Sequence, residues 1–130
     1  KQRKRKLVDP LQFEMSIQAE DLASYTPAFG WEMAPASEKQ IKALEKYGIF
    51  PDQIDNAGKA TMLLDRLNKR RAEGLTTPKQ IRFLEKKGFQ HVGTWSFESA
   101  RNLIDRIAAN NWRLPRGIVP AEYRPEGVIK

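Results

Sequence analysis

Basic side chains at helical spacing are the residues of this chain best suited to do chemistry, and that chemistry is the binding of anions. One stripe of bases, at i, i+3 and i+7 of a helix, occurs twice: Lys39, Lys42 and Lys46, then Lys79, Arg82 and Lys86, with Lys87 beside the second stripe. Bases on one face can hold the phosphates of a polyanion, and the free N–H groups at predicted helix starts, Ser37 and Thr77, could add to them. The alternative is that these bases are solvated faces of amphipathic helices, partly neutralised by Glu38, Glu45 and Glu85.

Catalytic constellations are not visible in the sequence. His91 is the single histidine and the chain has no cysteine, so neither a zinc site nor a His-dependent triad has the partners it needs. The segment Gly58-Lys59-Ala60-Thr61 departs from a phosphate loop, which requires Ser or Thr directly after the lysine. We therefore expect no enzyme activity, no metal and no cofactor for this chain by itself.

An internal repeat organises the elements that must position the bases. The same offset of 40 residues aligns two separated blocks: residues 37–48 with 77–88, and residues 60–67 with 100–107. A shared offset in two separate blocks is hard to produce by chance. The sequence therefore predicts two copies of one structural unit, unit one at residues 37–74 and unit two at residues 77–114.

Each unit is predicted to be a helix, an extended connection and a second helix. Ser37 and Thr77 have the character of N-caps and are followed three positions later by glutamine, which is the capping-box spacing. Gly48 and Gly88 fall where a left-handed C-cap is required. Competent N-caps also stand at the expected starts of the second helices, Asn56 and Ser96.

The fold class follows from the apolar face of the second helices. Unit one has apolar residues at i, i+3, i+4 and i+7: Ala60, Leu63, Leu64 and Leu67. Neither unit can bury this face alone, and the joint Leu75-Thr76 is too short for independent domains. We predict an all-α fold, a compact four-helix domain of two 40-residue repeats over residues 36–115. Asp65-Arg66 and Asp105-Arg106 recur at matching positions, which predicts a structural ion pair between the units.

The flanks have a different character. Residues 1–35 begin with a run of five bases and continue as a lead-in that holds acids but no base. Its apolar residues show no clean period, and three of them alternate in a way that predicts a short extended segment docking on the helical domain: Phe29, Trp31 and Met33. The tail, residues 116–130, contains Pro120 and Pro125 and is expected to be extended or mobile.

Composition narrows the class of protein. The formal net charge is +7, and residues 37–115 hold 15 bases against nine acids, which is expected either for a domain with a polyanionic partner or for an ordinary solvated surface. The absence of cysteine excludes disulfides and favours an intracellular, cytoplasmic setting. No apolar run approaches the roughly 18 residues of a membrane span, so we expect no membrane partner. Since the chain begins with Lys1, we expect it to be a piece of a longer protein.

Further bases and aromatic residues could extend a nucleic-acid surface. Three consecutive bases close the second helix of unit one: Lys69, Arg70 and Arg71. Trp95, Phe97 and Trp112 could stack on bases if they were exposed, although packing in the core is favoured at these spacings.

The repeated motifs resemble a known family. Each unit is similar to the tandem element at the C-terminal end of phage- and prophage-type superfamily II helicases of the Swi/Snf-like kind. The similarity lies in the block T-x-K-Q-I-x-x-L-x-x-x-G, the extended stretch after it, and a second block that begins A-x-x-L and contains Asp-Arg. Residues 11–17 and 29–35 resemble the lead-in of that family. In outline, each helix–extended-loop–helix unit is also similar to SAP-type DNA-binding modules.

The resemblance implies a parent protein that hydrolyses ATP with magnesium and remodels DNA in a bacterial or phage-infected cell, near the nucleoid. Nucleotide-binding and helicase motifs are absent from these 130 residues, so ATP and magnesium are expected only at the parent's motor domain. The expected function is a monomeric, non-catalytic accessory domain that holds DNA phosphates with low sequence specificity. The alternative is a protein-interaction module that docks on the helicase motor or on a partner, with the basic charge incidental.

Overall fold

The computed structural model describes residues 7–28 and 30–125, and these residues form helices and loops without a β-strand. The predicted all-α class is confirmed. Seven α-helices and two short 3₁₀ helices follow one another along the described chain: α2 (Pro10–Ser16), α3 (Glu20–Ala23), α4 (Gly30–Met33), α5 (Glu38–Lys46), η1 (Pro51–Gln53), α6 (Ala57–Ala72), α7 (Pro78–Lys86), η2 (Val92–Thr94) and α8 (Phe97–Ala109). The basic run at residues 1–6 and Phe29 lie outside the described residues.

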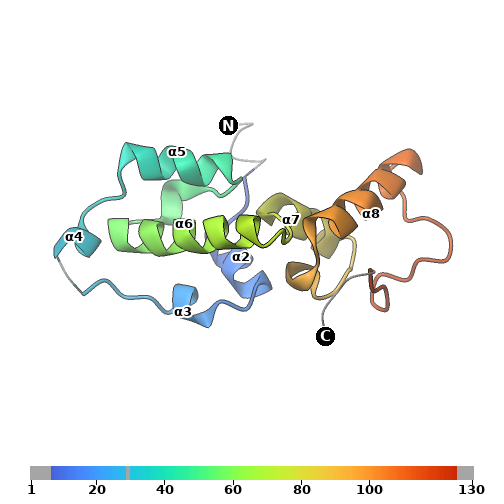
Figure 1. Ribbon diagram of the computed structural model, residues 1–130, viewed down its shortest axis with the longest axis horizontal. Coiled ribbons are helices and arrows are strands. Elements are labelled where there is room, and N and C mark those ends of the chain that lie inside the picture. The colour runs from blue at the N-terminus through green and yellow to red at the C-terminus, as the bar shows by residue number, and fades with distance from the viewer. Residues whose placement is uncertain (1–6, 29, 126–130) are drawn as a thin grey trace.

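The predicted capping boxes are confirmed at the starts of both first helices. Ser37 and Thr77 each accept a hydrogen bond from the backbone N–H of the glutamine three residues on, and that glutamine returns a bond to the cap backbone. Each first helix ends near a glycine with positive φ, 87° at Gly48 and 98° at Gly88. These local signals form one helix–connection–helix unit from α5 and α6 and a second from α7 and α8 (Figure 1).

The capping glutamines have a second role that explains why neither unit uses glutamate. The side-chain amide of Gln40 donates to Thr61 Oγ1 at 3.0 Å and to the Ala57 carbonyl at 3.4 Å. In unit two the amide of Gln80 donates to the carbonyl of Phe97 at 3.3 Å. Glutamate would complete the capping box but has no N–H to donate, so only glutamine can tie the first helix of a unit to the start of the second.

The core is built from the apolar faces of both units. Most predicted positions of the second helices are buried: Ala60, Leu63 and Leu67 in α6, and Ala100, Leu103 and Ile107 in α8. Leu64 is half-buried and packs against the same cluster. Apolar residues of the connections fold back over the helices and join the same cluster, among them Ile49, Phe89 and Trp95. Burial of these side chains, at roughly 25 cal/mol per Å² of apolar area, holds each connection against its own helix pair.

The lead-in forms short helices and enters this core. Asp9 caps α2, its carboxylate accepting from the N–H of Gln12 at 3.0 Å, and Pro10 occupies the first turn. Phe13 and Leu22 are almost fully buried in the cluster that the two units share. The predicted extended segment around Trp31 is wrong, because Gly30–Met33 is a turn of helix that leaves Trp31 59 % exposed.

Helix α2 lies between the two units and joins them (Figure 1). On the side of unit two, Ser16 donates to a Glu85 carboxylate oxygen at 2.8 Å. On the side of unit one, the Glu14 carboxylate forms an ion pair with Lys59 of α6 at 2.9 Å. Part of the junction between the units is therefore supplied by the lead-in.

The predicted ion pair between units is wrong. Arg66 pairs with Asp21 of the lead-in at 2.7 Å, and Asp105 pairs with Arg101 of its own helix at 4.0 Å. The repeated Asp-Arg positions therefore serve different partners, because only α6 has the acidic lead-in packed beside it. Helix α3 lies on the side of α6 opposite α5 in Figure 1, which leaves the exposed bases of α5 apart from the acids of α3.

The described part of the tail, residues 116–125, has no helix but is docked. The ring of Tyr123 packs edge-on against Phe89 at 5.5 Å and lies 5.6 Å from Trp95. Pro125 is buried. The tail thus covers the connection of unit two, while Val8 of the lead-in bonds to the connection of unit one through Gly48 and Phe50.

Gly58, in the first turn of α6, lies beneath the part of the lead-in between Tyr25 and Glu32, which we call the arm. A Cβ at this position would lie 2.9 Å from Glu32 Cβ, 3.0 Å from Tyr25 Cζ, and closer still to the Tyr25 hydroxyl. Gly58→Ala should lower the free energy of unfolding by about 1–3 kcal/mol, measured by urea titration, although alanine is the better helix former. In a Tyr25→Ala background, which removes the phenol but keeps Glu32, the same substitution should cost less. An equal cost in both backgrounds would contradict a clash with Tyr25.

The Tyr25 hydroxyl donates a short hydrogen bond to the Glu32 carboxylate, which makes the arm sensitive to pH. That bond, with some burial, raises the pKa of Tyr25 to about 12, and bonds from Tyr25 and from the Ala28 N–H lower the pKa of Glu32. The stabilisation from Glu32 is present above its ordinary pKa of 4.5 and is lost as the pH falls through the lowered pKa. The stabilisation from Tyr25 is present below its ordinary pKa of 10.0 and is lost as the pH rises through the raised pKa of about 12. The difference in melting temperature between the native chain and Tyr25→Phe should therefore be largest between these limits. A difference independent of pH would contradict this role.

Candidate nucleic-acid interface

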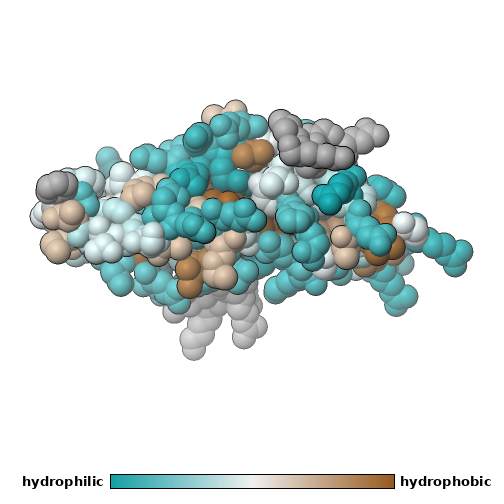
Figure 2. Space-filling view, turned by 90° about the horizontal axis from the view of Figure 1, so that it is seen from below, coloured by the Kyte–Doolittle hydropathy of each residue, from teal (hydrophilic) through white to brown (hydrophobic). Residues whose placement is uncertain are grey.

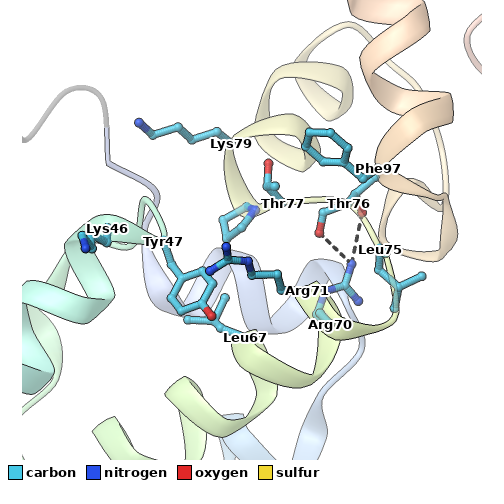
Figure 3. Close-up of a pocket in the computed structure, with 12 residues that line it drawn as sticks. Lys46, Tyr47, Leu67, Arg70, Arg71, Leu75, Thr76, Thr77, Lys79 and Phe97 are labelled. Atoms are coloured by element: carbon cyan, nitrogen blue, oxygen red, sulfur yellow. Dashed lines mark hydrogen bonds between the residues drawn. The ribbon is translucent and has the colours of Figure 1, made fainter.

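A cleft of about 520 Å³ opens where the two units meet. Its walls come from the C-terminal ends of α5 and α6, from the joint between the units, and from the starts of α7 and α8 (Figure 3). The residues that line it are Lys46, Tyr47, Leu67, Arg70, Arg71, Gly74, Leu75, Thr76, Thr77, Pro78, Lys79 and Phe97. We refer to it as the junction cleft.

The junction cleft is positively charged. Four of its lining residues are bases, namely Lys46, Arg70, Arg71 and Lys79, and no lining residue is an acid. Lys46, Arg71 and Lys79 are exposed, so their charged groups are available to a ligand. Bases that converge on a concave, partly apolar surface attract anions more strongly than the same charges on a flat surface, because the low dielectric of the walls focuses the field.

The N-terminal end of α7 adds to this potential. Thr77, the cap of α7, and the next two residues all line the junction cleft. The N-terminal end of a helix carries about half a positive elementary charge. Of the two helix starts expected to hold phosphates, Thr77 therefore faces the cleft, whereas Ser37 is not among the residues that line it.

Arg70 holds the floor of the cleft together. Arg70 is only 8 % exposed, and its Nη2 donates to the carbonyl and the hydroxyl of Thr76 at 3.2 and 3.1 Å (Figure 3). The same nitrogen donates to the carbonyl of Gly93 at 2.9 Å. The guanidinium lies 5.9 Å over the ring of Phe13 from the lead-in. Burial lowers the pKa of Arg70 from its ordinary value, but an arginine remains charged. Arg70 therefore contributes its charge to the cleft while its hydrogen bonds join unit one, the joint and unit two.

Lys79 crosses from one unit to the other. A Cβ on Gly48 would lie 3.0 to 3.4 Å from three carbons of the Lys79 stem, so the stem packs directly on the glycine. Gly48 thus serves the positive φ of its own helix end and the close approach of a lysine from the other unit. The packed stem fixes where the ammonium group emerges at the rim of the cleft.

Aromatic and aliphatic side chains complete the cleft. Phe97, the first residue of α8, is 37 % exposed and lies across the cleft from Lys46 and Lys79 (Figure 3). The hydroxyl of Tyr47 forms a short hydrogen bond with the Asn68 side chain, which fixes the ring of Tyr47 against α6. The cleft can therefore offer charge on one side and a flat apolar ring on the other.

The structure separates the bases chosen from the sequence into three groups. Lys46 and Lys79 line the junction cleft. Three others are exposed on the first helices but do not line it: Lys39, Lys42 and Lys86. The third group is Arg82 and Lys87, which have structural partners. Arg82 donates to the Leu7 carbonyl at 2.8 Å, and Lys87 donates to the Trp112 carbonyl at 2.9 Å.

Arg70 and Arg71 are the two cleft bases that the repeated stripes did not select. They belong to the basic run that ends α6 and have no basic counterparts in unit two, where Asn110 and Asn111 stand at the equivalent positions. A run of three bases directly before a short joint was the available signal, because a joint between units brings the end of one helix to the start of the next.

Among the aromatic residues considered for stacking, only one lines the cleft. Trp95 is 2 % exposed and belongs to the core. Trp112 is 56 % exposed, but its ring packs edge-on against Phe83 at 6.0 Å and it does not line the cleft. Phe97 is the remaining candidate.

Residues 7–28 and 30–125 contain no cluster of three or more His, Cys, Asp or Glu side chains that could hold a metal ion. His91 is exposed, and its left-handed backbone (φ 58°) caps η2. Within the same described part of the chain, no helix combines the length and apolar content that crossing a membrane requires.

Comparisons with protein-family models, with curated proteins and with solved structures found no match to this chain. The fold and the cleft define the protein as an all-helical tandem repeat with a basic cleft between its units. The resemblance to helicases remains a prediction from the sequence.

Proposed function

We propose that this chain is a non-catalytic nucleic-acid-binding domain that holds DNA phosphates at the junction cleft. In keeping with the resemblance of its repeated motifs, it would act as an accessory domain of a larger ATP-dependent helicase, in the cytoplasm and near the nucleoid. The observation that carries the proposal is the composition of the cleft: four bases, no acid and the positive end of α7 around one concave surface. Phosphates are the anions that such a surface would recognise in a polyanion.

The exposed bases of α5 would extend the interface. Lys39 and Lys42 are exposed and lie on the helix whose last residue, Lys46, lines the cleft. A strand held at the cleft could therefore continue along α5 on the side away from the acidic lead-in. Contacts of this kind position a backbone without reading its sequence, so low sequence specificity is expected.

Fluorescence anisotropy of labelled DNA, titrated with the chain at several salt concentrations, tests the proposal. Release of counterions gives a slope of log affinity against log salt of about −0.7 per contacted phosphate for single strands and −0.9 for duplex. With three exposed bases at the cleft, we expect a slope of about −2 or steeper. Absence of binding even at low salt would refute the proposal.

A protein-docking function is the second candidate, and the exposed apolar side chains of the lead-in favour it. Trp31 and Met33 on α4 are 59 % and 63 % exposed, as are Leu11 and Met15 on α2 at 50 % and 63 %. The face drawn in Figure 2 is mostly hydrophilic, with its apolar residues in small separate groups. A helicase motor or another partner could cover such groups. This candidate expects no salt-dependent affinity for DNA.

A further inference from the structure

We infer that the junction cleft binds single-stranded nucleic acid, with one unpaired base on the ring of Phe97 and its phosphate between Arg71 and Lys79. The inference rests on the proposed function and specifies the ligand of the same site. It starts from the two kinds of surface that the cleft combines, since a site for phosphates alone needs only charge.

The apolar part of the cleft favours an apolar occupant. Leu67, Leu75 and Pro78 line it together with Phe97, and its volume of about 520 Å³ lies within the range of roughly 300–1,000 Å³ typical of sites for small ligands. A duplex presents phosphates and sugars along its outside and keeps its bases stacked inside. A single strand can turn a base out of the stack, so it can fill the apolar part and the charged part together.

Phe97 is held in place before any ligand arrives. Its N–H donates to the carbonyl of Gly74 at 2.7 Å, and its carbonyl accepts from the side chain of Gln80 at 3.3 Å. Both backbone groups are thus fixed by residues on either side of the joint, while 37 % of the residue remains exposed. A ring on a fixed backbone loses little conformational entropy when a base stacks on it.

Two exposed basic side chains of the same cleft can supply the charge for a phosphate next to that base. Arg71 reaches from α6 and Lys79 from α7, and both line the cleft together with Phe97 (Figure 3). Guanidinium binds phosphate through two parallel hydrogen bonds and ammonium binds it as a point charge, so the pair can hold one phosphate from two sides. The base and the phosphate of one nucleotide would then be recognised by different walls of the same cleft.

The test compares three labelled probes of equal length in anisotropy titrations at one salt concentration: single-stranded oligothymidine, a duplex, and a strand of abasic residues. The expected result is that oligothymidine binds more tightly than both other probes. Phe97→Ala should lower the affinity for oligothymidine by roughly 5- to 150-fold, the value of one stacked base, and leave that for the abasic strand unchanged. Phe97→Trp should restore binding, and Trp112→Ala, an exposed aromatic residue outside the cleft, should have no effect.

Phe97→Leu is the second variant, because it keeps apolar volume on the core side and removes only the aromatic face. It should lose affinity for oligothymidine as alanine does, with an unchanged circular dichroism spectrum. Equal affinity for duplex and single strand, or equal loss for the abasic strand, would overturn the inference while the proposed function stands. If none of the three probes binds at low salt, the proposed function itself fails.

Discussion

Replacing Lys59 with methionine is expected to lower the free energy of unfolding by about 3–5 kcal/mol and the melting temperature by roughly 10–20 °C. The Lys59 ammonium pairs with Glu14 at 2.9 Å, and the Glu14 side chain is only 2 % exposed. Lys59 also donates a short hydrogen bond to the Leu22 carbonyl. Methionine keeps most of the stem but leaves a buried carboxylate without its counterion, and this cost would fall on the junction between the lead-in and α6. Thermal and urea unfolding measure it.

Two controls isolate the buried pair. Arg66→Met breaks another ion pair between α6 and the lead-in, but Arg66 and Asp21 are 32 % and 54 % exposed, so the loss should stay within about 1 kcal/mol. The double variant Glu14→Leu with Lys59→Met removes both buried charges and should recover most of the stability. If Lys59→Met cost no more than Arg66→Met, the buried pair would not be what holds the lead-in.

Reversing two charges at the junction cleft, with Arg71→Glu and Lys79→Glu together, is expected to reduce affinity for DNA by about 100-fold or more at low salt. Each lost hydrogen bond to a charged group costs about 1.5–3 kcal/mol, and 1.4 kcal/mol is a tenfold change. The slope of log affinity against log salt should also become shallower by about 0.7 to 0.9 for each lost contact. Both residues are exposed, and an acid in the first turn of α7 favours the helix, so the variant should fold.

The matched control is Lys86→Glu with Arg113→Glu. It changes the net charge by the same amount at two exposed bases that lie neither at the cleft nor on α5. Loss of long-range attraction alone should weaken binding by much less than the cleft variant does. Equal losses in the two variants would show that DNA responds to overall charge and not to this cleft.

The parts of the fold that the sequence predicts correctly are those decided by neighbouring residues. A capping box needs only a hydroxyl and a glutamine three residues apart, so Ser37 and Thr77 could be recognised as helix starts without knowledge of the fold. The sequence repeat then predicted that the two units have the same structure. The apolar faces of α6 and α8 followed from their period, and each is long enough for the period to show.

The lead-in was harder to predict because its structure depends on packing and not on neighbouring residues. Helices of four to seven residues, such as α4 and α2, are too short to display a period of 3.6. They are stabilised by the surface on which they pack, as the arm over Gly58 is by the Tyr25 hydroxyl group and its bond to Glu32. The partners of the repeated Asp-Arg positions depend on this packing as well, which is why Arg66 pairs with the lead-in and not with unit two.

For the candidate site, residue types alone indicate a basic surface, whereas the position of each base depends on tertiary packing. Residue types specify charge, so the excess of bases and the run that ends α6 were evident from the sequence. Whether a base faces a ligand depends on which segment packs beside it: the Leu7 carbonyl engages Arg82, whereas Gly48 leaves room for Lys79 to reach the cleft rim. Such contacts join residues up to 75 positions apart. Local spacing carries no information about them, since they form only when the units and the lead-in pack together.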